Sequence, residues 1–406
     1  MRRRFVTLIY NPEIPEVKRM KCFRRACCLL LCVLFLLPLS ALGEEDVLTQ
    51  AGLALFGSEV YYPQLTKAPD DALLEDINRL IVTGLHADQY LDRMALVMSN
   101  TVKITTTYTA DVTGDVLTCV LSASGPLKNN RATHAFTSVN IDLLTGQEIT
   151  LADVFASPED AVICLETLLT ETIAPELSAH LDASAVTPLP EMFALTPWGM
   201  TLYYPVEQLS ALSGQAGAIH LTWGEVQSAG AELILSPGSI LDRMGVFKHL
   251  TLSENTPALL EEALSGRCLP GIPAVLDEAV APLVESHHLL IDPDLYEGGR
   301  MLSLQGAAFR QVYVLTDSLT EAFDLSVVQG VRADRLTLCG LVTGQTLRED
   351  YLAVLGQPRS TVTLAGDDAE KWRLPEGTSD YYSVGGMTLR LHCNQEGVLT
   401  IVFLTP

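Results

Sequence analysis

Histidines are the first residues to test for chemistry, because imidazole serves both as a metal ligand and as a general base. No histidine of this chain stands in an H-E-x-x-H or H-x-H pattern. Adjacent His287 and His288 point to opposite sides of any regular element, and His220 lies between Ile219 and Leu221 in a strand-like run. We therefore predict solvent-facing histidines, and neither a metal site nor a cofactor site. The eight histidines are His86, His134, His180, His220, His249, His287, His288 and His392.

The other motifs that carry catalysis are also missing from the sequence. It contains no G-x-S-x-G elbow and no S-x-x-K with a K-T-G partner. Residues 292–298 resemble the start of a calcium loop, but Tyr296 occupies the third ligand position and no glutamate closes the loop, which predicts a surface turn. The acidic doublets at 261–262 and 367–368 are expected to be solvated, because neighbouring carboxylates splay apart. We predict no catalytic residues, although a triad assembled from distant residues stays open.

An aromatic cluster is the candidate binding site. Trp198, Tyr203 and Tyr204 fall within seven residues, between Pro197 and Pro205. Neighbouring tyrosines on a strand face opposite sides, so one is expected in the core and the other can be exposed. Exposed aromatic side chains are frequent anchors at interfaces. We predict these three as partner-binding residues, with packing inside the core as the alternative.

The amino-terminal segment has the three parts of a secretory signal. A basic stretch from Met20 precedes an apolar run over 26–37, and Ala41 and Gly43 are small residues at a cleavage position. The expected signal peptide is residues 1–43, with translation starting at Met1 or Met20. The apolar run is shorter than the ~20 residues of a membrane helix, so an uncleaved anchor is the weaker alternative.

Cysteine usage gives little further information. Four of the nine cysteines lie in the leader, and the other five are widely spaced without a C-x-x-C motif. An odd, unclustered set indicates neither a disulfide framework nor a zinc site. These five are Cys119, Cys164, Cys268, Cys339 and Cys393.

Hydrophobic periodicity predicts an α+β fold with helices packed on antiparallel sheets, in two or three domains after the signal peptide. The first domain is expected over 44–240, from helices at 70–81, 90–97 and 162–173 and strands at 102–108, 117–123, 136–142, 193–195, 200–204 and 218–223. Pro175 is expected to end the third helix. A second domain is expected over 241–340. Residues 341–406 form a helix followed by three strands, either as a separate unit or as one domain with 241–340.

Five segments between about 60 and 226 carry a resemblance. They are Tyr61-Tyr62-Pro63-Gln64-Leu65, Ile77-Asn78, the run from Val139-Asn140-Ile141-Asp142 to Phe155, Phe193-Ala194-Leu195-Thr196-Pro197-Trp198-Gly199, and Leu202-Tyr203-Tyr204-Pro205. In order and spacing the region resembles the extracytoplasmic domain of sigma-V-type anti-sigma factors and of PdaC-type peptidoglycan deacetylases. That resemblance implies the fold more than a chemistry. It also implies a lysozyme-like protein or peptidoglycan as partner.

The carboxy-terminal unit has a weaker resemblance. The frame of Gly344-x-Thr346 and Leu355-Gly356-x-Pro358 is similar to small α/β repeats of outer-membrane assembly lipoproteins and β-lactamase-inhibitor-like proteins. A helix stop before a strand explains the same residues.

The excess of acidic over basic residues argues against some classes of function. The first 43 residues hold eight of the 26 basic residues and two of the 49 acidic ones, so residues 44–406 carry 18 basic and 47 acidic side chains, a net charge of −29. Such a surface repels nucleic acid and anionic membranes. We predict a secreted or cell-surface, non-catalytic binding protein of the cell envelope, of Gram-positive type, with a basic protein or peptidoglycan as partner. A membrane-anchored, anti-sigma-like sensor and an unrecognised cell-wall hydrolase are the alternatives.

The leader gives a first testable prediction. The mature protein should begin at or within a few residues of Glu44 and should be recovered outside the membrane, because the small residues before Glu44 fit signal-peptidase cleavage. Mass spectrometry of the native N-terminus checks this. Recovery of the intact leader in membranes alone would contradict it.

Overall fold

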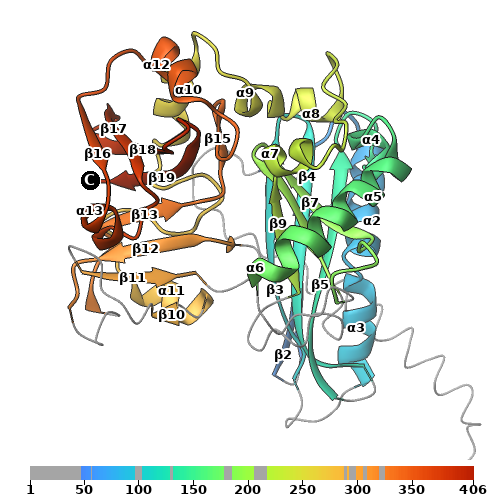
Figure 1. Ribbon diagram of the computed structural model, residues 1–406. Helices are drawn as coiled ribbons and strands as arrows, with labels where there is room; N and C mark the ends of the chain where they lie inside the picture. The colour runs from blue at the N-terminus through green and yellow to red at the C-terminus, as the bar shows by residue number, and fades with distance from the viewer. Residues whose placement is uncertain are drawn as a thin grey trace, which may run out of the picture. The chain divides into compact units, whose positions relative to one another are not determined.

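The computed structural model describes residues 47–55, 57–96, 103–128, 131–177, 185–204, 217–287, 290–291, 299–304, 309–319 and 325–406. Val47–Pro406 form one compact unit. The predicted signal peptide, Pro205 and the calcium-like turn lie outside the described residues. Helices pack on mainly antiparallel sheets in this unit, which confirms the α+β prediction (Figure 1).

The first sheet has six strands in the order β1-β2-β3-β4-β5-β6, and helices α2 and α3 pack against one of its faces (Figure 1). The alternation predicted at 117–123 is confirmed: Leu117, Cys119, Leu121 and Ala123 are fully buried under the helices. These elements are β1 (Leu48–Leu55), β2 (Ser58–Leu65), α2 (Asp71–Gly84), α3 (Ala87–Leu96), β3 (Thr105–Thr113), β4 (Val116–Lys128), β5 (Arg131–Asp142) and β6 (Gln147–Glu148).

A three-stranded sheet, β7-β8-β9, packs with short helices around a second hydrophobic cluster that includes Trp223 and Phe155. Its strand β7 lies against β4 and β5. The elements are α4 (Leu151–Val154), α5 (Pro158–Leu168), the π-helix η1 (Leu169–Ile173), α6 (Ala174–Leu177), β7 (Met192–Thr196), β8 (Gly199–Tyr203), β9 (Ala218–Thr222), α7 (Trp223–Ser228), α8 (Ile240–Arg243) and α9 (Val246–Leu250).

The prediction that Pro175 ends a helix is wrong. The chain continues from α5 through the π-helical turn into α6, and Pro175 occupies the first turn of α6. Pro175 has no N–H to donate, and the hydrogen-bond ladder changes to its wider π-helical form in the turn directly before it.

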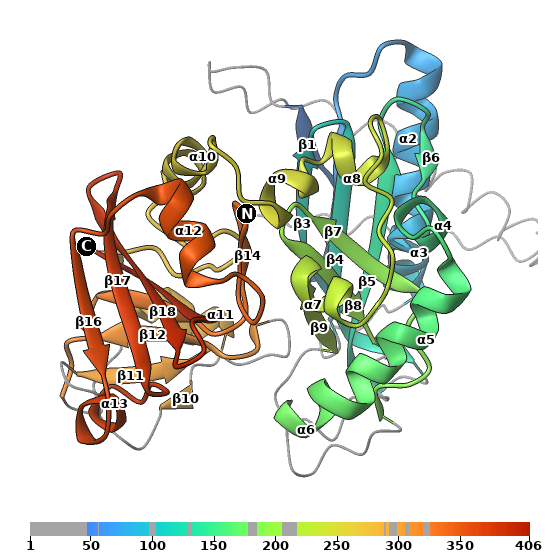
Figure 2. The same cartoon turned by 45° about the horizontal axis from the view of Figure 1, so that its top comes forward.

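The carboxy-terminal half is built on an eight-stranded antiparallel sheet in the order β10-β11-β12-β13-β19-β18-β17-β16. Figure 2 shows α10 and α12 beside one another against this sheet, where they cover a third hydrophobic cluster. The elements are α10 (Thr256–Ala263), α11 (Ala281–His287), β10 (Leu290–Ile291), β11 (Arg300–Ser303), β12 (Val312–Thr316), β13 (Gly330–Ala333), β14 (Thr337–Leu338), β15 (Leu341–Val342), α12 (Arg348–Leu355), β16 (Ser360–Leu364), α13 (Asp367–Lys371), β17 (Gly377–Val384), β18 (Met387–Asn394) and β19 (Leu399–Thr405).

The structure places the division of the chain later than the sequence suggested. Ile240, Leu241 and Val246 pack into the same cluster as Trp223, and the cluster of the carboxy-terminal half takes its first residue at Leu252. A cut at residue 240 would therefore separate α8 and α9 from their core. Strands β13 and β19 pair directly, so residues from 241–340 and from 341–406 share one sheet.

Two asparagine side chains join the segments that carry the resemblance to one another. The Asn140 amide on β5 donates to the Phe193 carbonyl (2.7 Å) and accepts from the Leu195 N–H (3.0 Å), as a neighbouring strand would. Asn78 on α2 makes the same pair with the N–H and carbonyl of Leu65, at 2.8 and 3.0 Å. Both asparagines satisfy backbone groups at the edges of strands, which would otherwise be buried without partners. These segments are architectural.

Replacing Asn140 tests this interpretation. Asn140→Ala should lower the free energy of unfolding by about 1–3 kcal/mol, because it leaves the buried Leu195 N–H without its acceptor. The matched control is Asn255→Ala, since Asn255 is exposed and its side chain makes no capping bond. Urea unfolding followed by circular dichroism measures both. Equal midpoints for the two variants would refute the role of Asn140.

Candidate functional site

The three predicted partner-binding residues do not form one exposed surface. Tyr204 is 1% exposed and donates its hydroxyl to the Val186 carbonyl (2.8 Å), which corrects the expectation that it could meet a partner. Tyr203 is half-buried, its ring centroid 5.4 Å from that of Phe136. As the strand period predicts, Tyr204 is the one in the core and Tyr203 the one nearer the surface.

Trp198 lies at the other end of β8. It is half-buried, and its ring meets the His249 ring edge-on with centroids 6.1 Å apart. A side chain at Gly271 would come within 2.4 Å of the indole nitrogen. Trp198 therefore packs between α9 and the carboxy-terminal half, which is the structural alternative for this residue.

A serine–histidine pair that sequence reasoning missed lies inside the carboxy-terminal sheet. Ser379 Oγ lies 2.9 Å from His392 Nδ1, and His392 Nε2 lies 2.9 Å from the Pro375 carbonyl. A carbonyl only accepts, so Nε2 carries the proton and Nδ1 accepts from the serine hydroxyl. Both residues are 0% exposed. Burial lowers the pKa of His392 to about 4, although the Pro375 contact opposes this shift. The pair is neutral, satisfied and closed to substrate.

A cysteine–histidine pair has the same character. Cys339 Sγ lies 3.9 Å from His249 Nδ1, which also accepts from the Cys339 N–H at 3.2 Å. Cys339 is 0% exposed, and burial raises the pKa of its thiol to about 12, with Glu262 adding to the shift. A thiol of this kind is not an activated nucleophile.

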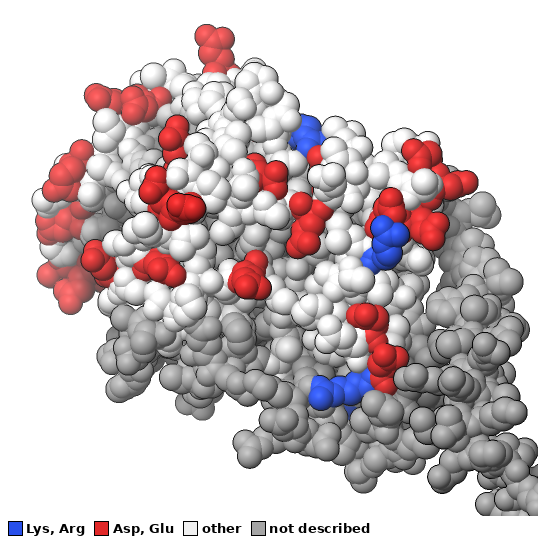
Figure 3. All heavy atoms as spheres, turned by 90° about the vertical axis from the view of Figure 1, so that its right-hand side faces the viewer, with Lys and Arg blue, Asp and Glu red and all other residues white. Residues whose placement is uncertain are grey.

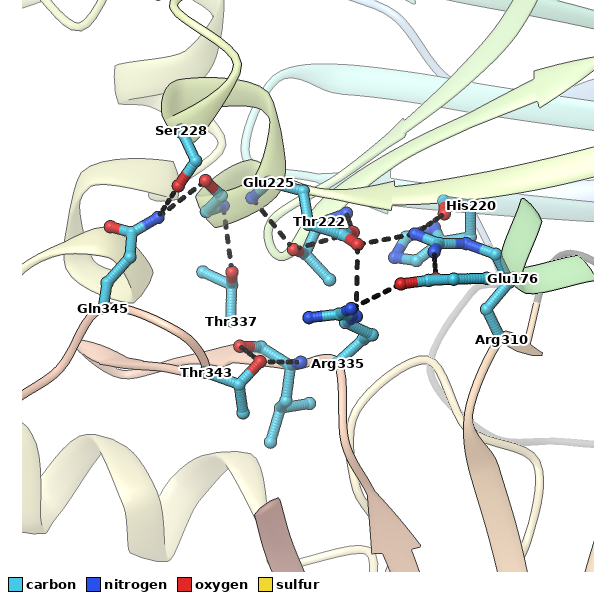
Figure 4. Close-up of polar contacts among 12 residues, drawn as sticks. Glu176, His220, Thr222, Glu225, Ser228, Arg310, Arg335, Thr337, Thr343 and Gln345 are labelled. Atoms are coloured by element: carbon cyan, nitrogen blue, oxygen red, sulfur yellow. Dashed lines mark hydrogen bonds and ion pairs between the residues drawn. The ribbon is translucent and has the colours of Figure 1, made fainter. Parts of the chain in front are cut away.

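Figure 4 shows a charged cluster that joins the two halves of Val47–Pro406. Arg310 is buried and donates to Glu176 (2.7 Å) and to Glu225 (2.6 Å), while Arg335 donates to Glu176 at 2.6 Å. Glu225 also receives the Thr222 N–H in a capping box at the start of α7. Two arginines meet two carboxylates, so the cluster is neutral, and both carboxylates are engaged.

The environment of Glu225 shows which protonation state this carboxyl group has in the cluster. Burial alone would raise the pKa of Glu225, but Arg310 and the Thr222 N–H outweigh it and hold the pKa below its usual range. The carboxylate therefore stays ionised as a structural partner rather than serving as a proton donor. Nearby, a Cβ atom at Gly224 would lie 2.3 Å from the Val342 side chain. The backbone of Gly224 in the amino-terminal half therefore packs directly against the Val342 side chain of the carboxy-terminal half.

The exposed face of the amino-terminal helices is acidic. Figure 3 looks at the side where α2 to α5 lie in Figure 1, and acidic side chains outnumber basic ones across it. An open groove of about 610 Å³ lies beside α2, lined among others by Asp71, Leu74, Glu75 and Val82. Further exposed carboxylates on these helices are Asp76, Asp88, Asp92, Asp153, Glu159 and Asp160.

The described part of the chain contains neither a cluster of metal-ligating side chains nor a helix that could span a membrane. No three histidine, cysteine or carboxylate side chains among the described residues gather as a metal site would require. No helix in that same part has the length and hydrophobicity to cross a bilayer.

Comparison with known proteins gives a likeness over half of the chain. No family model and no curated protein matches. A member of the DUF3298 family from Bacteroides fragilis is 14% identical, with 49% of this chain and 96% of that one covered and a TM-score of 0.33. A DUF3298 family protein from Pseudomonas aeruginosa is 13% identical, with 47% and 97% covered and a TM-score of 0.33. The chain is thus similar to domains of unknown function, and the closer resemblance to PdaC-type and sigma-V-type domains remains a prediction.

The buried histidine predicts a dependence of stability on pH. His392 has a folded pKa of about 4 against about 6.5 in an unfolded chain, so between these values the unfolded state binds more protons. Stability should therefore fall as pH decreases from 6.5 toward 4, by about 1.4 kcal/mol per unit from this residue. His392→Gln should flatten the slope of unfolding free energy against pH, measured by urea denaturation. Other groups titrate in both proteins, so identical slopes would contradict the assignment.

Proposed function

We propose that the protein is an exported, non-catalytic binding protein of the cell envelope, and that its acidic face recruits a basic partner protein. The observation that carries the proposal is the concentration of exposed carboxylates on α2 to α5, seen in Figure 3. Residues 44–406 carry 18 basic against 47 acidic side chains, so a cation is attracted over a long range.

The burial of the potentially reactive serine, cysteine and histidine side chains supports a binding function rather than catalysis. The Ser379–His392 pair is enclosed in the carboxy-terminal half, and Cys339 of that half meets His249 of α9; the serine, the cysteine and His392 are 0% exposed. A catalytic group must reach the atom it attacks or deprotonates.

The groove beside α2 supports a protein partner. Its wall combines the carboxylates of Asp71 and Glu75 with the half-buried apolar side chains of Leu74 and Val82. Interfaces use apolar contacts for affinity and charged rims for approach and orientation. Arg79, also at the groove, lies 2.6 Å from Asp76, so its charge is offset locally.

Titration with hen lysozyme, a basic protein, tests the proposal by calorimetry at low and moderate salt. Binding should weaken as salt is added, because added ions shorten the Debye length from about 10 Å at 0.1 M. Glu75→Gln combined with Asp92→Asn should weaken binding by about two- to tenfold at low salt, since exposed ion pairs contribute little each.

The matched control removes two charges elsewhere. Glu254→Gln with Glu261→Gln takes the same charge from exposed positions in and before α10. Equal losses in the two double variants would show that net charge acts without a site on α2 and α3. Binding that is insensitive to salt would contradict the proposal, and no binding would direct the search to peptidoglycan.

A further inference from the structure

Five neighbouring strands of the carboxy-terminal sheet carry a row of alternating aromatic and cationic side chains. The register pairs Tyr313 with Arg332, Arg332 with Phe403, Phe403 with Arg390, and Arg390 with Tyr381, from β12 through β13, β19 and β18 to β17. These strands lie side by side in the sheet in this order (Figure 1). Residues directly opposite one another share a face of the sheet, so all five side chains line one face.

Arg332 is the neutralised cation of this row. Its guanidinium makes two hydrogen bonds of 2.7 Å with the carboxylate of Asp334, and its Nη1 donates to the Arg373 carbonyl at 3.0 Å. It also lies 5.1 Å from the centre of the Tyr313 ring. Its charge and its donors are therefore taken up within the protein.

Arg390 has no such partner. It is 6% exposed, and among the described residues no carboxylate forms an ion pair with it, whereas the equally buried Arg310 and Arg332 each have one. Three rings surround its guanidinium, with centres 4.8 Å (Phe403), 5.3 Å (Trp372) and 5.4 Å (Tyr381) away. Aromatic faces attract a cation but carry no net charge. A positive charge is thus left unbalanced in an otherwise strongly acidic chain.

The hydrogen bonds of Arg390 fix which of its atoms are available. Its Nε donates to Ser379 Oγ at 3.0 Å, and the serine in turn donates to His392. Among the described residues, no hydrogen bond is made by either Nη group. One end of the guanidinium is anchored by the serine, and the other keeps its donors free.

The neighbouring side chains on the same face differ in burial on the two sides of Arg390. Ser379 and His392, on one side of the row, are fully buried. On the other side the next residues of β18, β19 and β17 are Thr388, Thr405 and Ser383, which are small and half-buried or exposed. The row is therefore bordered by small, less buried side chains on this side.

We propose that Arg390 is the centre of a binding site for a small monocarboxylate with a ring or apolar body. The two free Nη donors match the two oxygens of a carboxylate, and a single negative charge balances the single unpaired cation. The half-buried ring of Tyr381 offers the remainder of the ligand a surface to pack against. A dianion such as phosphate would add a second negative charge for which this row has no cation. The Arg390 site lies in the carboxy-terminal half and the acidic face lies on the amino-terminal helices. The proposed carboxylate site can therefore be tested independently of the proposed basic partner protein.

Benzoate is the probe, and the indole N–H signals of the three tryptophans in an ¹⁵N-correlation spectrum are the readout. The Trp372 signal, assigned with Trp372→Phe, should shift saturably with benzoate, because its ring lies 5.3 Å from the Arg390 guanidinium. The affinity for uncharged benzamide and the affinity for sulfate should each be at least about tenfold lower than that for benzoate. Arg390→Gln should lose benzoate binding by the same factor. Arg359→Gln removes an exposed cation from the same half and should leave binding unchanged.

A measurement without ligand separates binding from a structural role. An unpaired buried cation adds little to folding stability, so Arg390→Gln should have a urea midpoint equal to or above that of wild type. Arg332→Gln leaves the Asp334 carboxylate without its partner, so its urea midpoint should be lower than that of wild type. If Arg390→Gln does not fold or loses as much as Arg332→Gln, the residue is structural and the proposal fails. Arg390→Lys keeps the charge without the fork and should bind benzoate severalfold more weakly. Unchanged binding in Arg390→Gln or Arg390→Lys, equal binding of benzamide, or tighter binding of sulfate would overturn the proposal.

Discussion

The side chain of Asn140 occupies the position that a neighbouring strand would take beside β7, and the meeting of the first two sheets depends on it. Thr118 and Ser138 add hydroxyl donors to the carbonyls of Leu195 and Phe193, so this contact between sheets is polar as well as close. Asn78 closes the end of β2 in the same way. Backbone groups that leave water need partners, and here side chains supply them where the strand ladders stop.

The same constraint governs the few cations of this acidic chain. Arg310 ties the two halves together through Glu176 and Glu225, Arg243 reaches Asp142, and Arg348 holds the fully buried Asp380. Each pair is costly to break, because removal of one partner leaves the other charge buried alone. Arg390 departs from this rule among the described residues, and that departure is what marks it as a ligand site.

The two proposed binding surfaces use opposite charges in different ways. Exposed carboxylates on α2 to α5 act together at long range and lose strength as salt is added. Arg390 acts alone at short range, enclosed by rings that keep water away from most of its surface. An acidic surface with one enclosed cation can hold a basic protein and a small acid at once, without the two competing for one site.

The sequence by itself determined the local elements and the sign of the surface. Period-2 runs such as Leu117–Ala123 and the helical spacing of Ile77 and Ile81 are local properties, so α2, β4 and the antiparallel α+β class followed from them. Only the tertiary structure decided the pairs that join distant residues: Arg310 with Glu225 is separated by 85 positions, and Asn140 with Leu195 by 55. Neither spacing nor composition records which residues meet when sheets and halves close on each other. Tyr204 is an example, since the carbonyl of Val186 that accepts its hydroxyl becomes its neighbour only after the chain folds.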